Sequence, residues 1–131
     1  MEKIIKMLML TLCVLLCGCS HRQPQSRLVT GIHVQAQQQQ VILDRTYTDP
    51  EKMEAVLYYL RALEQRQPVS NDPERYAGRQ YRIELTYSDG TTRQIFQRCD
   101  QFLSEDLGPW QTVDRKKAAF LYPLLKSIPS D

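Results

Sequence analysis

The sequence predicts an α+β domain of two layers, an antiparallel sheet with two helices, in the order β-β-α-β-β-β-β-α. Three observations lead to this prediction. Stretches that alternate apolar and polar residues, the period of a strand, lie before and after one stretch with the three-and-four spacing of a helix. The leucine-rich stretch at the end has the helical spacing again. Helices do not alternate with strands one by one, which favours an antiparallel sheet with helices on one side.

The first two strands are expected at 27–36 and 41–47, where alternate residues are apolar over much of each stretch. The glutamine run Gln37–Gln40 lies between them. Four glutamines are too few for prion-like behaviour, so we interpret the run as a polar turn.

A helix is expected from Asp49 to about Gln67. Asp49 is a favoured N-cap residue, and Pro50 suits the first helical position. Pro68 disfavours a helical conformation in the residue before it, so the helix should end near Gln67. A loop at 69–78 follows. The residues that form one apolar stripe at helical spacing are Met53, Val56, Leu57, Leu60 and Leu63.

A β-hairpin is expected from two strands at 79–87 and 91–99. Tyrosine, isoleucine and leucine alternate with polar residues in the first strand. Gly90 supplies the positive φ that a hairpin turn requires. Ile95 and Phe96 are adjacent in the second strand and must point to opposite faces, so the sequence leaves open which of them faces the core.

Two short strands at 101–104 and 110–113 complete the predicted sheet, with Trp110 expected in the core. Asp114 caps a last helix of apolar spacing. Pro123 lies inside this helix and removes one backbone donor, so a kink or a restart is expected there.

The N-terminus resembles that of bacterial lipoproteins. Two lysines precede a short apolar run, the layout of a secretory signal peptide. The run is shorter than the roughly 20 apolar residues of a spanning helix. It ends in Leu16-Cys17-Gly18-Cys19, which resembles the lipobox, whose cysteine is joined to diacylglycerol and becomes the first residue after cleavage. We therefore expect a signal peptide at 1–18 and lipidation of Cys19; the alternatives are a plain signal peptide and an uncut anchor.

Residues 19–26 are expected to be a polar tether, and residues 27–131 a single α+β domain. A tether of seven residues extends to at most roughly 25 Å. The domain is thus expected at the cell membrane, lipid-anchored on its extracytoplasmic face, with membrane lipid as a partner through the acylated Cys19. Since Cys13 and Cys17 would leave with the signal peptide, Cys99 has no partner for an intramolecular disulfide, and we interpret it as a small buried hydrophobe in preference to a reactive thiol.

The charge of the chain gives no sign of nucleic-acid binding. The chain has 17 Lys and Arg against 15 Asp and Glu, and the signal peptide removes Lys3, Lys6 and Glu2. Nucleic-acid binding normally shows as a strongly basic face. We expect no nucleic-acid partner and a monomer.

The sequence contains no motif for catalysis, a metal or a cofactor. His21 and His33 have no partner at metal-ligand spacing, and neither a nucleophile elbow nor a phosphate-binding glycine loop is present. The alternatives are a Cys99 nucleophile with His33 as base and a pair of carboxylates of the glycosidase type. We therefore predict no catalytic residue, no metal ligand and no cofactor.

Recognition by the hairpin is the positive candidate. Arginines alternate there with tyrosines, and arginine offers a fixed fork of donors while tyrosine offers a flat amphipathic ring. We expect Arg82 and Arg93 to anchor a carboxylate or phosphate and Tyr87 to make a flat contact. The alternative is an ordinary solvent face on which Glu84 pairs with arginine across the strands.

Three segments resemble a group of small, uncharacterised lipoproteins of Gram-positive gut bacteria, which share a domain of unknown function. They are YTDPEKMEAVLYYLRAL at 47–63, IELTYSDGTTRQI at 83–95 and LGPWQTVDRKKAAFLYPLLKSIPSD at 107–131. Their shared motifs, a helix start, a hairpin turn and a Gly-Pro-Trp turn, are structural. The resemblance implies the fold and the anchoring and carries no activity.

The function expected from the sequence is that of a membrane-anchored extracytoplasmic lipoprotein, a non-catalytic binding or regulatory module at the cell envelope. Its partner would be an envelope protein or polymer that the sequence does not identify. The alternative is a surface enzyme without a recognisable motif.

Overall fold

The computed structural model describes residues 27–69, 73 and 77–131. The predicted signal peptide and the tether, including Cys19, lie outside the described residues. The strands are β1 (Val29–Gln38), β2 (Gln40–Tyr47), β3 (Gln67–Pro68), β4 (Gln80–Tyr87), β5 (Thr92–Arg98), β6 (Phe102–Glu105) and β7 (Gln111–Thr112). The helices are α2 (Pro50–Ala62), α3 (Arg115–Ala118) and α4 (Leu121–Ser127).

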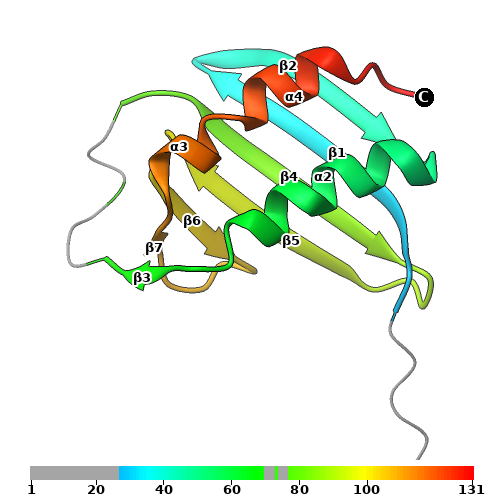
Figure 1. Cartoon of the computed structure of the whole chain (residues 1–131), viewed down its shortest axis with the longest axis horizontal. Helices are drawn as coiled ribbons and strands as arrows, with labels where there is room; N and C mark the ends of the chain where they lie inside the picture. Colours follow the sequence, from blue (N-terminus) through cyan, green and yellow to red (C-terminus); the bar gives the residue numbers. More distant parts are fainter. Residues whose placement is uncertain (1–26, 70–72, 74–76) are drawn as a thin grey trace, which may run out of the picture.

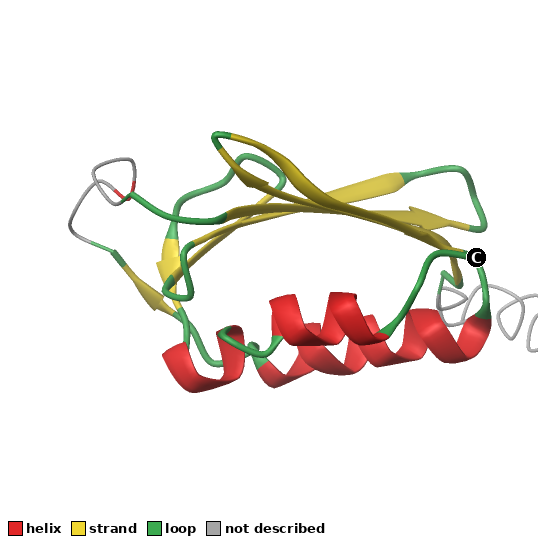
Figure 2. Cartoon of the chain, turned by 90° about the horizontal axis from the view of Figure 1, so that it is seen from above, coloured by secondary structure: helices red, strands yellow, loops and turns green. Residues whose placement is uncertain are grey.

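The strands form a single sheet of seven in the order β2-β1-β4-β5-β6-β7-β3 (Figure 1). Every pair of neighbours is antiparallel. The helices α2, α3 and α4 lie together on one face of the sheet (Figure 2). The predicted α+β class and antiparallel sheet are confirmed. The observed order adds the two-residue strand β3 and divides the last helix into α3 and α4.

The turn between β1 and β2 contains fewer residues than the glutamine run that was expected to form it. Gln38 pairs with Gln40, and Gln39 alone turns the chain with a φ of 66°. The run is exposed. Glutamines can therefore continue both strands while their amides stay in water, because β2 is an edge strand of the sheet.

The N-terminus of α2 is the predicted one, but its C-terminus is not. The Asp49 carboxylate accepts a hydrogen bond from the backbone N–H of Lys52 at 3.1 Å. The helix ends at Ala62, well before Gln67, so the position inferred from Pro68 is wrong. Arg66 Nε donates to the carbonyl of Leu63 at 2.9 Å, which caps the helix end. Residues Gln67 and Pro68 then pair with β7 as an edge strand, where a missing N–H is tolerated.

The β4–β5 hairpin forms as predicted. Gly90 has a φ of 85°, and the Asp89 carboxylate accepts a hydrogen bond from the backbone N–H of Thr91 at 3.0 Å. Ile95 is buried against the helices, while Phe96 lies on the other face, partly exposed. The register that the sequence left open is thereby settled.

The last helix restarts ahead of Pro123. Asp114 caps α3 by accepting hydrogen bonds from the backbone N–H groups of Lys116 and Lys117. The helix α3 ends at Ala118, and α4 begins at Leu121. Pro123 therefore stands in the first turn of α4, where the absent N–H would have had no partner within the helix.

A single core cluster lies between the helices and the sheet. It draws Met53, Val56, Leu60 and Leu63 from α2 and the turn after it, as the apolar stripe predicted. Trp110, expected in the core, is only partly buried. The core side chains of the sheet are Ile32, Val34, Ala36, Leu43, Tyr47, Tyr81, Ile83, Leu85, Ile95 and Leu103.

The C-terminal residues fix the end of α4 against β2 and α2. The Asp131 carboxylate accepts hydrogen bonds from the backbone N–H groups of Thr48 and Asp49 and pairs with Lys52 Nζ at 3.1 Å. The hydrogen bond from the Thr48 backbone contributes most, and together these bonds hold the pKa of Asp131 well below its ordinary value. The Asp131 N–H also donates to the carbonyl of Thr46 on β2. This clamp helps to set the distance between α2 and α4.

Candidate functional site

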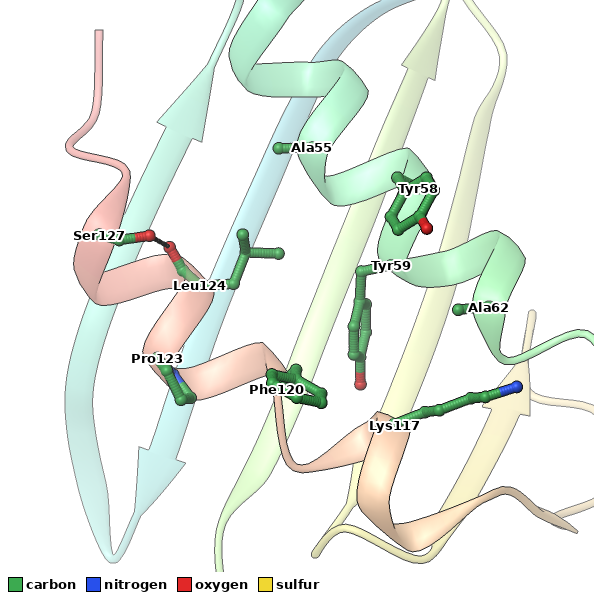
Figure 3. Close-up of a pocket in the computed structure, with 9 residues that line it drawn as sticks. All are labelled: Ala55, Tyr58, Tyr59, Ala62, Lys117, Phe120, Pro123, Leu124 and Ser127. Atoms are coloured by element: carbon green, nitrogen blue, oxygen red, sulfur yellow. Dashed lines mark hydrogen bonds between the residues drawn. The ribbon is translucent and has the colours of Figure 1, made fainter.

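A groove of about 620 Å³ lies between α2 and the α3–α4 segment, on the side of the helices that faces away from the sheet (Figure 3). Cavities that bind small molecules are commonly about 300–1,000 Å³. The groove is lined by Ala55, Tyr58, Tyr59, Ala62, Lys117, Phe120, Pro123, Leu124 and Ser127.

The wall on α2 follows from helical spacing. Ala55, Tyr58, Tyr59 and Ala62 are separated by three, four and seven residues, so they share one side of the helix. The two alanines leave room between the helices. Tyr58 and Phe120 stand on opposite sides of the groove and are 72% and 66% exposed, so two aromatic rings meet solvent at its rims.

The floor of the groove contains Tyr59, whose hydroxyl is fully engaged. It donates to Gln97 Oε1 and lies 3.2 Å from the carbonyl of Ala118. Gln97, which is 1% exposed, donates from Nε2 to the carbonyls of Ala118 and Cys99, each at 3.3 Å. Burial raises the pKa of Tyr59 far above its ordinary value. Tyr59 therefore stays neutral and offers the groove its ring.

The groove carries charge at one end. Among its described lining residues, Lys117 is the only charged one, and it lies near Ala62 in Figure 3. Ser127 lies toward the other end, and its hydroxyl donates to the carbonyl of Leu124 at 2.7 Å. The α3–α4 region between Asp114 and Asp131 holds four basic residues and no acidic one.

The structure does not bring the predicted ligand residues of the hairpin together. Arg93 is paired with Leu85, so it lies on the helix-covered face, which Tyr87 shares. Arg82 is paired with Phe96 and lies on the other face. Arg82 and Arg93 therefore do not form one surface, because their side chains point to opposite faces of the sheet.

Arg93 and Tyr87 have partners within the protein. Arg93 forms an ion pair with Glu105, which also pairs with Arg66 at 2.8 Å. The hydrogen bond to Glu105 is the main cause that raises the pKa of Arg93. Burial alone would raise the pKa of Glu105, but the two arginines outweigh it and hold that pKa below its ordinary value. The Arg27 guanidinium lies 5.1 Å from the centre of the Tyr87 ring.

Arg82 lies on the solvent-facing side of the sheet among other polar residues. Its guanidinium is 3.8 Å from the carboxylate of Glu84. On the same face the His33 ring is 2.7 Å from Asp44, and Gln35 donates to Asp44 at 3.1 Å. These contacts are those of a polar, partly solvated sheet face. The ion pair of Glu84 is with an arginine of its own strand, and its partner across the strands is Gln94.

His33 and Cys99 are not among the residues that line the groove, and they do not lie on neighbouring strands. His33 is on β1 and Cys99 follows β5, with β4 between the two strands. Cys99 has a φ of 52°, is half-buried, and its Sγ lies 3.3 Å from the carbonyl of Ala77. Within 27–69, 73 and 77–131, no group of three or more His, Cys, Asp or Glu side chains forms a metal site.

The rim residues of the groove were missed from the sequence, although one signal points to them. Tyr58 and Tyr59 are adjacent on a helix, so they cannot both face the sheet. One tyrosine had to face away from the core. Phe120 gave no such signal, because the break that exposes it between α3 and α4 depends on tertiary packing.

The chain matches no protein family, no curated protein and no solved structure. In the part of the chain that the structure describes, no helix is long and apolar enough to cross a membrane. The role of the groove is therefore inferred from its shape, its polarity and its charge.

Proposed function

We propose that this chain is a lipid-anchored lipoprotein on the extracytoplasmic face of the cell membrane, and that it acts as a non-catalytic binding module through the groove between α2 and α3–α4. The observation that carries the proposal is the groove itself, an open apolar cavity with two exposed aromatic rings at its rims. Concave, mostly apolar cavities of this volume with a few polar groups are the usual form of small-molecule binding sites.

The energy for binding would come from the rims. Tyr58 and Phe120 expose most of their surface, and covering apolar surface is worth roughly 25 cal/mol per Å². A domain confined near the membrane also meets its ligand at raised effective concentration. A site of modest affinity is sufficient under that confinement.

The lining supports binding in preference to catalysis. Its described side chains that carry a polar group at the groove are Lys117, Ser127 and the two tyrosines. The Ser127 hydroxyl donates to a backbone carbonyl in its own helix, and no histidine or carboxylate lines the described walls to act as a base. A nucleophile needs such a base close by.

The anchoring is tested by replacing the lipidated cysteine. In cells that express Cys19→Ala, the protein should keep its signal peptide or leave the membrane fraction. Cys99→Ala is the matched control and should be processed and fractionated as wild type. Unchanged processing and membrane association of Cys19→Ala would show that the anchoring proposal is wrong.

The groove is tested with the neutral apolar dye Nile red on the chain from residue 19 with Cys19→Ser. The protein with an unchanged groove should bind the dye and raise its fluorescence. Phe120→Ser should lower the affinity for the dye, because it removes the aromatic ring at one rim. Ile42→Ser is the control, since Ile42 is 38% exposed on β2 and outside the groove. Equal loss in both variants, or in neither, would contradict the assignment of the groove.

A further inference from the structure

We infer that the occupant of the groove is an amphiphile with a long acyl chain and an anionic head group, the head at Lys117 and the chain along the groove toward Ser127. This inference rests on the proposed function of the groove and adds the chemical class of its ligand.

The polarity of the groove favours a hydrocarbon chain over an extended peptide. The hydroxyls of Tyr59 and Ser127 already donate to Gln97 Oε1 and to the carbonyl of Leu124, so neither has a hydrogen left to donate to the carbonyls of a peptide. A peptide backbone that loses water without new hydrogen bonds costs several kcal/mol, on the order of 2–7 for each amide. An acyl chain has no such groups to satisfy.

The charge of the groove favours an anionic head. Lys117 is the one charged residue among the described lining, and Arg115 and Lys116 precede it on α3. The nearest acidic residue in sequence, Asp114, is engaged by the backbone N–H groups of Lys116 and Lys117 as their cap. The carboxylate of Asp114 thus stays at the helix start, and the lysine side chain keeps its charge for a ligand.

The tether places such ligands within reach. If Cys19 is anchored, the domain that begins near Leu28 lies within roughly 25 Å of the bilayer, which is a reservoir of acyl amphiphiles. The thickness of one helix layer, about 10–12 Å, is smaller than this reach. The helical side of the domain can therefore face the membrane without strain on the tether.

The experiment compares two soluble amphiphiles of equal chain length below their micelle concentrations, dodecanoate and the neutral dodecyl maltoside. Binding to the chain from residue 19 with Cys19→Ser is measured by calorimetry. Lys117→Gln should weaken dodecanoate about fivefold, the value of one partly solvated ion pair of about 1 kcal/mol. It should leave dodecyl maltoside unchanged.

The matched control is Lys126→Gln. Lys117 is on α3, whereas Lys126 is on α4, where its Nζ lies 5.2 Å from the centre of the Tyr122 ring and it lines a different crevice beside β2. This variant should bind dodecanoate as wild type does. Phe120→Ser should weaken both amphiphiles, and near-UV circular dichroism of every variant checks that the fold is retained.

Each other result overturns a stated part of the inference. Equal binding of both amphiphiles with no effect of Lys117→Gln would refute the anionic head and leave the groove as a binding site. No binding of either amphiphile or of Nile red would refute the groove as a site. Binding to phosphatidylglycerol vesicles without binding to dodecanoate would assign the face to the membrane surface, and a dimer abolished by Phe120→Ser would assign it to a second copy.

Discussion

On one face of the β4–β5 hairpin, Tyr81, Ile83 and Leu85 are buried under the helices, whereas on the other face Arg82 and Glu84 meet solvent. The two faces are formed by alternating residues of the same strands. A single step along the chain therefore moves a side chain from the core into water.

The comparison shows why two arginines that look equivalent in the sequence are not. Arg93 lies on the covered face, where it is partly buried and pairs with Glu105. Arg82 lies on the open face, 51% exposed, with a distant contact to Glu84. Composition along a strand describes a face only after the register with its neighbours is known.

The largest difference between the faces is expected for apolar contacts. Ile83 is fully buried, so Ile83→Ala should lower the free energy of unfolding by about 2–5 kcal/mol, because it leaves a cavity under the helices. Its neighbour Arg82→Ala should change that energy by no more than about 0.5 kcal/mol. Urea unfolding of both variants gives the two values. Similar losses of unfolding free energy in the two variants would contradict the description of one face as buried and the other as solvated.

A smaller difference is expected for hydrogen bonds. Gln97 on the covered face accepts from Tyr59 and donates to two carbonyls, so Gln97→Met should lower the free energy of unfolding by about 1–3 kcal/mol. Gln94 on the open face can exchange its bond to Glu84 for water, and Gln94→Met should be nearly neutral. Thermal unfolding of the pair measures the contrast, and a neutral Gln97→Met would break it.

The smallest difference is expected for charge, and it depends on pH. Glu105→Gln should lower the free energy of unfolding by about 1 kcal/mol near neutral pH, since it weakens the pairs with Arg66 and Arg93. The pKa of Glu105 is held below its ordinary value of 4.5, so its contribution is complete above that value and is lost as pH falls through the lowered pKa.

Urea unfolding of wild type and Glu105→Gln across this acidic range should therefore bring the two stabilities together as the carboxyl becomes protonated. Glu84→Gln, the control on the open face, should show little difference from wild type at neutral pH. A gap between wild type and Glu105→Gln that widens in acid would contradict the role given to the two arginines.

Much of the fold follows from local signals. Asp49 and Pro50 begin α2, Gly90 turns the hairpin, and Asp114 begins α3, each for a reason that acts within a few residues. The end of α2 does not follow, because Leu63 leaves the helix so that β3 can pair with β7, a contact between distant segments. The same holds for Ile95 and Phe96, whose faces are set by pairing with β4 and β6.

The groove was beyond the reach of sequence analysis for a related reason. Tyr58 is on α2, whereas Lys117 and Phe120 belong to the α3–α4 segment far along the chain. The space between them depends on how the C-terminal clamp at Asp131 positions α4. The alternation of arginines and tyrosines in the sequence points to the hairpin instead. Side chains spaced along one strand divide between two faces, while side chains of two packed helices can meet in one cavity.

The position of β1 inside the sheet also determines how the domain bears mechanical load. A pull on the chain ahead of Val29 enters a strand that is paired with β4 from Val29 to Gln37 and with β2 from Ile32 to Gln38. Antiparallel hydrogen bonds run across the strand, so both ladders resist together in shear. A pull on Asp131 meets first the bonds to Thr46, Thr48 and Asp49 and the ion pair with Lys52, at one end of the helix layer. Forced unfolding is governed by the unfolding rate under load. We therefore expect the domain to resist a pull at Val29 more strongly than a pull at Asp131.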